Sequence, residues 1–148
     1  MTQNEAIEKM KRYCAYQERC QSEVRQKLYG LGLNNDEIEN VLCSLIEQNF
    51  INEERFAKTF ARGKFRQKKW GKVKIKQHLK QKQISAYCIQ TGLEEIDTES
   101  YKNTLDLVLL KKEKLLIDEN DFTKKQKLAK HAINKGFESD LVWESIGN

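Results

Sequence analysis

The stretch SEVRQKLYGLGLNNDEIENVL, from Ser22 to Leu42, decides the fold of this chain. Its apolar residues are separated by steps of 4, 5, 5 and 4 positions and are Val24, Leu28, Leu33, Ile38 and Leu42. A step of four keeps two side chains on one face of a helix, whereas a step of five beside glycines indicates that one helix ends and another begins. The stretch therefore predicts two helices joined by a short turn.

The same spacing occurs twice more along the chain. Shifted by 51 positions it falls on Ile75, Leu79, Ile84, Ile89 and Leu93, and shifted by a further 53 positions it falls on Leu128, Ala132, Phe137, Val142 and Ile146. Such a register is hard to obtain by chance in a chain in which 33% of the residues are charged. A period of this length is typical of stacked helical units, each of which is too small to bury a core well on its own.

Polar residues mark the starts of the repeated helices. Asn34 with Glu37 three residues later has the form of a capping box, and Ser85 stands at the equivalent place in the second copy. Ser22 is the predicted cap of the first helix of the first copy, and Ser139 is the predicted cap near the end of the third copy. These caps agree with the helix boundaries that the apolar spacing predicts.

A longer helix follows the pair in the first two copies. Asn52 is the predicted cap of one such helix, EERFAKTFARGKFRQKK, and Asp97 is the predicted cap of its counterpart. No window alternates apolar and polar residues as a half-buried strand would. The sequence therefore predicts an all-α fold, an elongated tandem array of about three three-helix repeats. We expect an N-terminal helix in 1–21, repeat 1 in 22–70, repeat 2 in 71–120 and a partial repeat 3 in 121–148.

Composition agrees with this architecture and excludes several classes of function. The chain of 148 residues has no proline, which favours helices joined by short turns. It has no apolar run typical of a signal peptide or a membrane span, so we expect a cytoplasmic, monomeric protein. The four cysteines match no zinc framework and the two histidines stand alone, so we expect neither a metal nor a cofactor. No catalytic motif is present, which argues against an enzyme.

The charge is distributed unevenly along the chain. Between Glu54 and Glu94 there are 12 basic residues and no acidic one, which leaves 15 basic against 22 acidic residues elsewhere. Helix surfaces usually mix the two signs, so this acid-free segment is expected to meet an external anion. That anion is either the phosphate backbone of a nucleic acid or an acidic protein groove. The alternative is a helix surface that is merely solvated.

Two rows of basic residues are expected to meet at the turn around Trp70 and Gly71. The predicted residues for binding a nucleic acid or a partner are Lys58, Arg62, Arg66, Lys68, Lys69, Trp70, Lys72, Lys74, Lys76 and Lys80. Trp70 itself has two interpretations, because an aromatic ring here can stack on an unpaired base or close the turn against the core.

The segment RFAKTF, which begins at Arg55, and the later KKWGKVKIKQHLKQKQI resemble the central signature of the RecX regulators of bacterial homologous recombination. The matching residues are Arg55, Phe56, Ala57, Lys69, Gly71, Ile75, Leu79 and Ile84. Upstream, RCQSEVRQKLYGLGL resembles the opening motif of the family. The sequence departs from the family pattern at Asn52, before the acidic pair, at His78, where an acidic residue is frequent, and at Gln83, where glycine is frequent.

This resemblance implies a fold and a partner. RecX proteins are tandem three-helix units that bind the RecA recombinase as its filament on single-stranded DNA and inhibit its ATP hydrolysis and strand exchange. In this family picture the basic rows would contact either the phosphates of the single-stranded DNA directly or an acidic surface in the filament groove. The acidic flanks would contact basic patches of RecA. A helical protein that binds nucleic acid non-specifically through the same rows is the alternative, and a repeat adaptor for an unrelated partner is a third interpretation.

Overall fold

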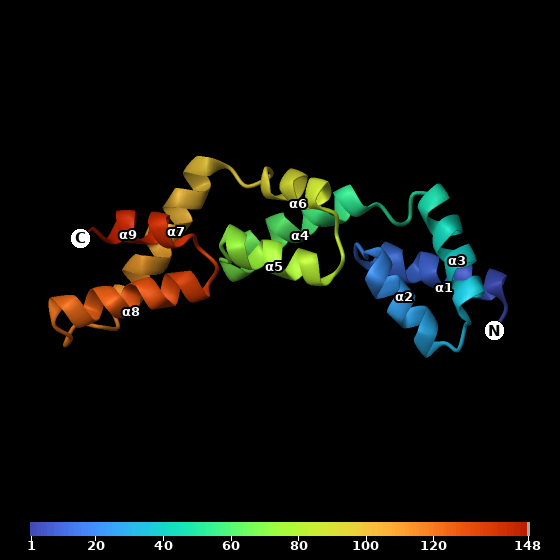
Figure 1. Cartoon of the computed structure of the whole chain (residues 1–148), viewed down its shortest axis with the longest axis horizontal. Helices are drawn as coiled ribbons and strands as arrows, with labels where there is room; N and C mark the ends of the chain where they lie inside the picture. Colours follow the sequence, from blue (N-terminus) through green and yellow to red (C-terminus); the bar gives the residue numbers. More distant parts are fainter. Residues whose placement is uncertain (148) are drawn as a thin grey trace.

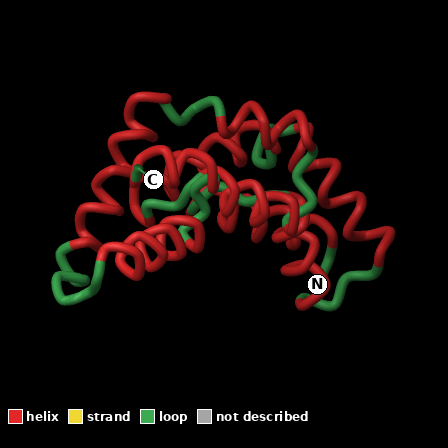
Figure 2. Tube along the Cα trace, turned by 60° about the vertical axis from the view of Figure 1, so that its left-hand side comes forward, coloured by secondary structure: helices red, strands yellow, loops and turns green. Residues whose placement is uncertain are grey.

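The computed structural model describes residues 1–147, and within this range it contains nine α-helices and no strand. The helices form an elongated array that extends from one terminus to the other (Figure 1). Turned by 60°, the same array is arched (Figure 2). The predicted all-α, elongated fold is therefore confirmed. No helix among the described residues is long and apolar enough to cross a membrane.

The first unit has a hydrophobic core of its own. It consists of the helices α1 (Gln3–Tyr16), α2 (Gln21–Gly30) and α3 (Asn35–Glu47). Ala6 and Met10 of α1 pack with apolar residues of α2 and α3, and all five apolar residues that define the first copy of the repeat are buried. The spacing of 4, 5, 5 and 4 thus identifies the buried side of this unit.

The second and third units share one continuous core. The second consists of α4 (Glu53–Lys68), α5 (Lys72–Gln81) and α6 (Ala86–Leu93), and the third of α7 (Thr98–Glu113), α8 (Asp121–Asn134) and α9 (Ser139–Ile146). Eight of the ten repeat residues predicted here are buried, while Leu93 and Ile146 are half-buried. Aromatic rings of α4 and α7 join the two units, because Phe65 packs on Tyr101 and Tyr101 packs on Phe137.

Most predicted helix caps are confirmed. Asn34 and Glu37 form the capping box of α3, and Ser85, Asn52 and Asp97 each accept a hydrogen bond from the third residue of the helix that follows. A side-chain acceptor at this position satisfies one of the backbone N–H groups that a helix start leaves without an intrahelical partner.

Two predicted caps are wrong by one or two residues. Helix α2 begins before Ser22, because Glu23 accepts a hydrogen bond from the backbone N–H of Cys20 at 3.1 Å and so makes Cys20 the capping residue. Helix α9 already includes Ser139, and the residue that precedes it with an extended backbone is Glu138.

The contacts suggest a different phase for the repeats. Helix α4 packs against α5 and α6, as α1 packs against α3 and α7 against α8 and α9. We propose that the units run from α1 to α3, from α4 to α6 and from α7 to α9, each opening with its long helix. The boundaries predicted after residues 70 and 120 fall between the first and second helices of these units, and the boundary predicted after residue 21 falls at the first residue of α2. In this phase the third unit also has three helices.

Candidate nucleic-acid and partner interface

The acid-free segment occupies α4, the turn after it, and α5. Lys69 ends α4 in a left-handed conformation with φ of 59°, and Gly71 precedes α5. The turn is fixed by the third unit, since the backbone N–H groups of Gly71 and Val73 donate to the carbonyl oxygens of Lys135 and Gly136 at 2.8 and 2.9 Å. The predicted turn at Trp70 and Gly71 is confirmed, and it is also the contact point of two units.

Two glycines allow this contact. A Cβ on Gly71 would lie 2.3 Å from backbone atoms of Gly136 and Phe137, and a Cβ on Gly136 would lie 2.3 Å from the Cβ of Lys74. Gly136 also has φ of +102°, which L side chains rarely adopt. The base of the candidate interface is therefore held by backbone atoms in direct contact.

Four of the twelve basic residues are paired with carboxylates that lie outside the acid-free segment. Arg55 pairs with Glu18. The other three pairs are Lys58 with Glu54 at 3.5 Å, Arg62 with Glu95 at 2.6 Å, and Lys82 with Glu23 at 3.0 Å. Lys58 and Arg62 were predicted as binding residues, but their charges are already partly compensated within the fold.

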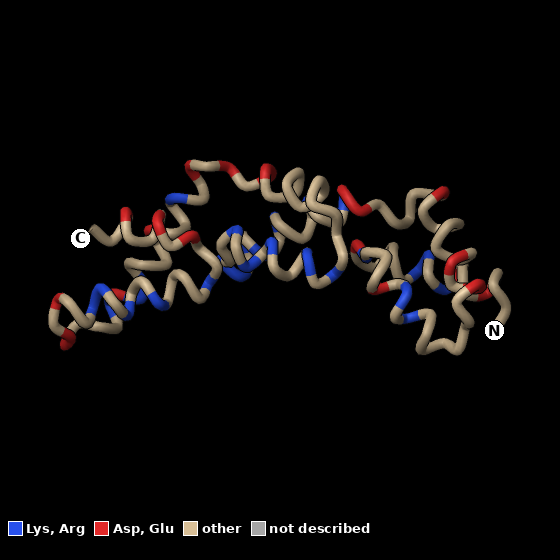
Figure 3. Tube along the Cα trace, in the orientation of Figure 1, with Lys and Arg blue, Asp and Glu red and all other residues tan. Residues whose placement is uncertain are grey.

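The other eight basic residues of the segment have no ion pair among the described residues. They are Lys64, Arg66, Lys68, Lys69, Lys72, Lys74, Lys76 and Lys80. Most of them are exposed, and basic positions gather where α4, α5 and the end of α8 come together (Figure 3). Seven of these eight are among the predicted binding residues, and Lys64 was not predicted.

Trp70 packs against the core at the turn, which is one of the two interpretations that the sequence left open. Its ring is half-buried against the shared core, with the ring centroid of Phe60 at 6.4 Å and that of His78 at 4.5 Å. The ammonium groups of Lys64 and Lys74 lie 5.1 and 4.7 Å from the centroid of the Trp70 ring. Trp70 therefore closes the turn and also contributes an aromatic face to the basic surface.

Burial and the positive charge of this surface together lower the pKa of two neighbouring groups. The pKa of His78 is lowered by burial and then by Lys74, Lys64 and Lys82. The pKa of Lys135 is lowered by burial and by the ammonium groups around it, and its Nζ donates to the carbonyl oxygen of Lys68 at 3.2 Å. The sequence did not predict Lys135 as part of the basic surface, because only the contact between Gly71 and Gly136 brings this residue of the third unit to the basic segment.

The row of lysines on α5 begins near Trp70 and continues along the helix. The ammonium group of Lys72 lies 4.8 Å from the ring centroid of Tyr101, and Lys76 and Lys80 follow at intervals of one helical turn and are exposed. Lys72 also starts the helix, where its backbone N–H donates to the Tyr101 hydroxyl at 2.9 Å. The Tyr101 hydroxyl in turn donates to Glu138, and its pKa is raised by burial and by that bond.

Acidic residues occupy the opposite edge of the array. They gather in the connection between α6 and α7 and on α9 (Figure 3). In the connection, the pKa of Asp97 is lowered because its carboxylate accepts hydrogen bonds from Ser100. This part of the array thus has a basic edge at α4 and α5 and an acidic edge at the α6–α7 connection and α9 (Figure 3), and it can contact surfaces of both signs at once.

No cluster of three or more His, Cys, Asp or Glu side chains that could hold a metal ion occurs among residues 1–147. All four cysteines are free thiols. Burial raises the pKa of Cys14 and of Cys20, which lowers the fraction of reactive thiolate at both positions.

Comparison with known families gives two matches in tandem. Residues 6–45 match the first three-helix domain of RecX, and residues 52–93 match the second three-helix domain of RecX. These two ranges coincide closely with the helix groups α1 to α3 and α4 to α6.

Similar proteins and structures carry the same name. The chain is 29% identical to the regulatory protein RecX of Prosthecochloris aestuarii, over 90% of this chain and 86% of that protein. It is 34% identical to that of Clostridium tetani, over 84% of this chain and 56% of the relative, and 30% identical to that of Streptococcus uberis, over 92% and 52%. The chain thus spans about half the length of the last two relatives.

Two crystal structures have the same fold. A crystal structure of regulatory protein RecX matches with a TM-score of 0.88 and 27% identity, covering 97% of this chain and 70% of the other. RecX from Lactobacillus salivarius matches with a TM-score of 0.87 over 97% of this chain and 94% of that one, and at 22% identity this match shows the fold alone.

Proposed function

The chain belongs to the RecX family, and we propose that it regulates the RecA recombinase by binding the RecA filament on single-stranded DNA. In this proposal it inhibits ATP hydrolysis and strand exchange by RecA, and so modulates homologous recombination, DNA repair and the SOS response. It acts in the cytoplasm, as a monomer, without catalytic activity of its own. The partner is inferred from the family resemblance, and the contact residues are inferred from the charges of this chain.

One observation carries the choice of contact surface. Eight basic residues of α4, of α5 and of the turn between them have no carboxylate partner within the described residues, and basic positions gather along one edge of this part of the arched array (Figures 2 and 3). An array of this shape can follow a helical groove, and unpaired ammonium groups can contact phosphates or an acidic protein surface there. The acidic edge supports contacts with basic patches on the same filament.

The proposal is tested by ATP hydrolysis of RecA assembled beforehand on single-stranded DNA, with this protein titrated in at constant salt. We expect the rate to fall at well below one molecule per RecA protomer, because an elongated array contacts several protomers. An unchanged rate, with this protein folded and RecA active, would overturn the proposed function.

Charge reversal tests whether the basic edge is the surface that contacts the RecA filament. Changing Arg66, Lys69, Lys72 and Lys76 together to Glu should abolish inhibition and leave the fold intact, since none of these side chains has an ion-pair partner to lose. The matched control reverses four basic residues that lie outside the acid-free segment and also have no ion pair, Lys9, Lys102, Lys114 and Lys130. If both quadruple variants inhibit equally, the basic edge is not the contact surface.

The aromatic face of Trp70 supports a second candidate function, which is non-specific binding of nucleic acid without RecA. This candidate expects tight binding to bare DNA with a steep salt dependence, in which the slope of log K against log salt is roughly −0.7 per phosphate contact on a single strand or −0.9 on a duplex. The RecA proposal instead expects inhibition that the affinity for bare DNA cannot account for.

A further inference from the structure

Three surface cavities lie where the first unit meets the second, and Lys82 lines all three. Two of them, with volumes of about 520 and 280 Å³, also share Glu23. We call these two cavities the inter-unit groove. Its lining includes Tyr13 and Lys27 from the first unit, Phe60 and Lys64 from the second, and Glu23 and Lys82 between them.

Two aromatic rings of the inter-unit groove, those of Tyr13 and Phe60, each lie beside two cationic groups. The guanidinium of Arg19 is 3.8 Å from the centroid of the Tyr13 ring, and the ammonium of Lys27 is 5.6 Å from it. At Phe60 the corresponding groups are Lys64 at 5.5 Å and Lys82 at 5.9 Å. Half-exposed rings with cations beside them suit a chain that carries both flat rings and negative charges.

Glu23 is the internal anion of the inter-unit groove. One of its carboxylate oxygens accepts a hydrogen bond from the backbone N–H of Cys20 at 3.1 Å, and the other pairs with the ammonium of Lys82 at 3.0 Å. The side chains of Glu23 and Lys82 are each about a quarter exposed, so the pair is accessible from the groove. An external anion can therefore compete with Glu23 for Lys82.

We propose that the inter-unit groove binds a short segment of single-stranded nucleic acid, whose phosphate displaces Glu23 from Lys82. That the bound strand is the single-stranded DNA of the RecA filament rests on the proposed function. The site itself is new, because none of its residues is among the predicted binding residues. The displaced pair is one of the few contacts between the first and second units. Binding in the groove therefore loosens the first unit from the rest of the array.

The chemistry of the groove favours a single strand over other anionic partners. A duplex keeps its base faces stacked, so the Tyr13 and Phe60 rings would have nothing to stack on, whereas each unpaired base offers a free face. An acidic protein segment would satisfy Lys27, Lys64 and Lys82 but would leave the rings without partners.

The experiment measures binding of a fluorescent oligothymidylate of about ten nucleotides by anisotropy over a range of salt concentrations, without RecA. Glu23→Gln keeps the acceptor for the Cys20 N–H and removes the charge that competes for Lys82. We expect it to tighten binding by roughly 2- to 5-fold and to steepen the salt slope by about 0.7. Lys82→Gln should weaken binding.

Glu39→Gln is the matched control, because it makes the same charge change in an ion pair with Arg25 outside the inter-unit groove. The proposal is overturned if Glu23→Gln and Glu39→Gln tighten binding equally, or if neither changes it. Because RecA is absent, this result is separate from the outcome of the ATP hydrolysis assay.

A second variant tests the rings. Tyr13→Leu keeps an apolar side chain but removes a stacking face, and it should weaken binding by at least ~5-fold without changing the salt slope. Tyr87→Leu, at a tyrosine that is 71% exposed on α6 and lines none of the three cavities, should have no effect. If Tyr13→Leu is neutral and polyglutamate competes as well as the oligonucleotide, the groove takes an acidic protein surface, and the proposal fails.

Discussion

The two junctions of this array are built in different ways. Between the second and third units the hydrophobic core is continuous, and two glycines bring backbone atoms into contact. Between the first and second units the cores are separate, and the contacts are mainly polar. The comparison shows that three similar units need not form three equal modules, since the second and third form one body to which the first is attached.

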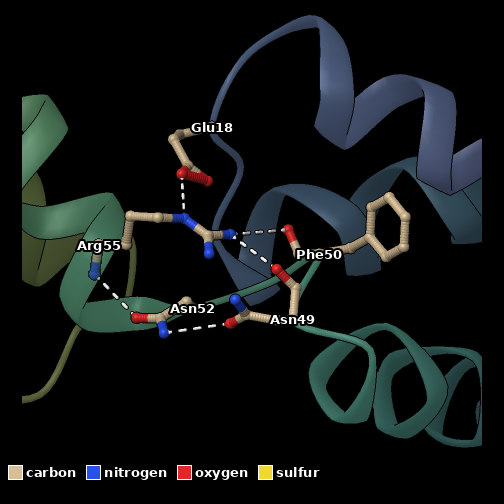
Figure 4. Close-up of polar contacts among 5 residues, drawn as sticks. All are labelled: Glu18, Asn49, Phe50, Asn52 and Arg55. Carbon is tan, nitrogen blue, oxygen red and sulfur yellow. Dashed lines mark hydrogen bonds and ion pairs between the residues drawn. The ribbon is translucent and has the colours of Figure 1, made fainter.

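The polar junction depends on few groups. Arg55 of α4 donates to the carbonyl oxygens of Asn49 and Phe50 at 3.0 and 3.3 Å and pairs with Glu18 of the first unit (Figure 4). Only Cys20 of the first unit is buried within the core of the other two. Ion pairs that remain partly exposed are weak and are screened by salt. We therefore expect the angle between the first unit and the rest to vary more than the angle at the glycine junction.

The largest effect is expected at the glycine junction. Gly71→Ala would place a Cβ 2.3 Å from backbone atoms of Gly136 and Phe137, which cannot move aside as a flexible side chain can. We expect a loss of about 3 kcal/mol in the free energy of unfolding, measured by urea denaturation. Hydrogen exchange should locate the loss in the second and third units and leave α1 to α3 unchanged.

Gly63→Ala is the matched control. Gly63 lies inside α4, and a Cβ there would meet nothing within 4 Å. Alanine in a helix interior is favoured over glycine by roughly 0.5–1 kcal/mol, so this variant should be more stable than the wild type. If Gly71→Ala were as stable as Gly63→Ala, close backbone contact would not be what holds the second and third units together.

A smaller effect is expected at the polar junction. Arg55→Met removes two hydrogen bonds to carbonyl oxygens and the ion pair with Glu18, which should cost about 1 kcal/mol of unfolding free energy because these contacts are partly exposed. The main result should be structural, namely a broader distribution of radii in small-angle scattering. Arg25→Met, which removes an ion pair inside the first unit, should leave that distribution unchanged.

The fold followed from the sequence because the repeat spacing corresponds directly to burial. Leu28, Leu79 and Ala132 occupy equivalent places in the three copies, and all three are fully buried. The proposed phase of the units differs from the predicted one. The apolar face of α4 is equally compatible with packing on the helices before it or after it, and its contacts with α5 and α6, including the close approach of Gly92 to Ala57, support the proposed phase.

The candidate interface was less predictable, because three of its twelve basic residues are paired through tertiary contacts that no local pattern shows. Glu23 and Lys82 are 59 positions apart, and no local pattern relates them. Lys135 lies outside the acid-free segment and reaches it only through the glycine junction. The basic character of the surface was visible in the sequence, but which of its charges are unpaired depends on how the units stack.

The smallest effect is expected at Glu53, which lies at the polar junction. One of its carboxylate oxygens accepts a hydrogen bond from the backbone N–H of Gln21, and the other is buried with no hydrogen-bond partner among the described residues. Burial therefore raises the pKa of Glu53 above its ordinary value of 4.5. A raised pKa in the folded state means that the protonated form stabilises the fold below pH 4.5, and that this contribution is lost as the pH rises through the folded-state pKa.

Glu53→Gln should consequently stabilise the protein at pH 7, by about 0.5 kcal/mol, and should have no stabilising effect below pH 4.5, as measured by urea midpoints at both pH values. Glu54→Gln controls for the helix dipole, because Glu54 lies in the same first turn but pairs with Lys58. The control should lose a few tenths of a kcal/mol at pH 7. Equal losses for both variants would mean that the Glu53 carboxylate is as well solvated as that of Glu54, and that the polar junction is more open than its buried oxygen indicates.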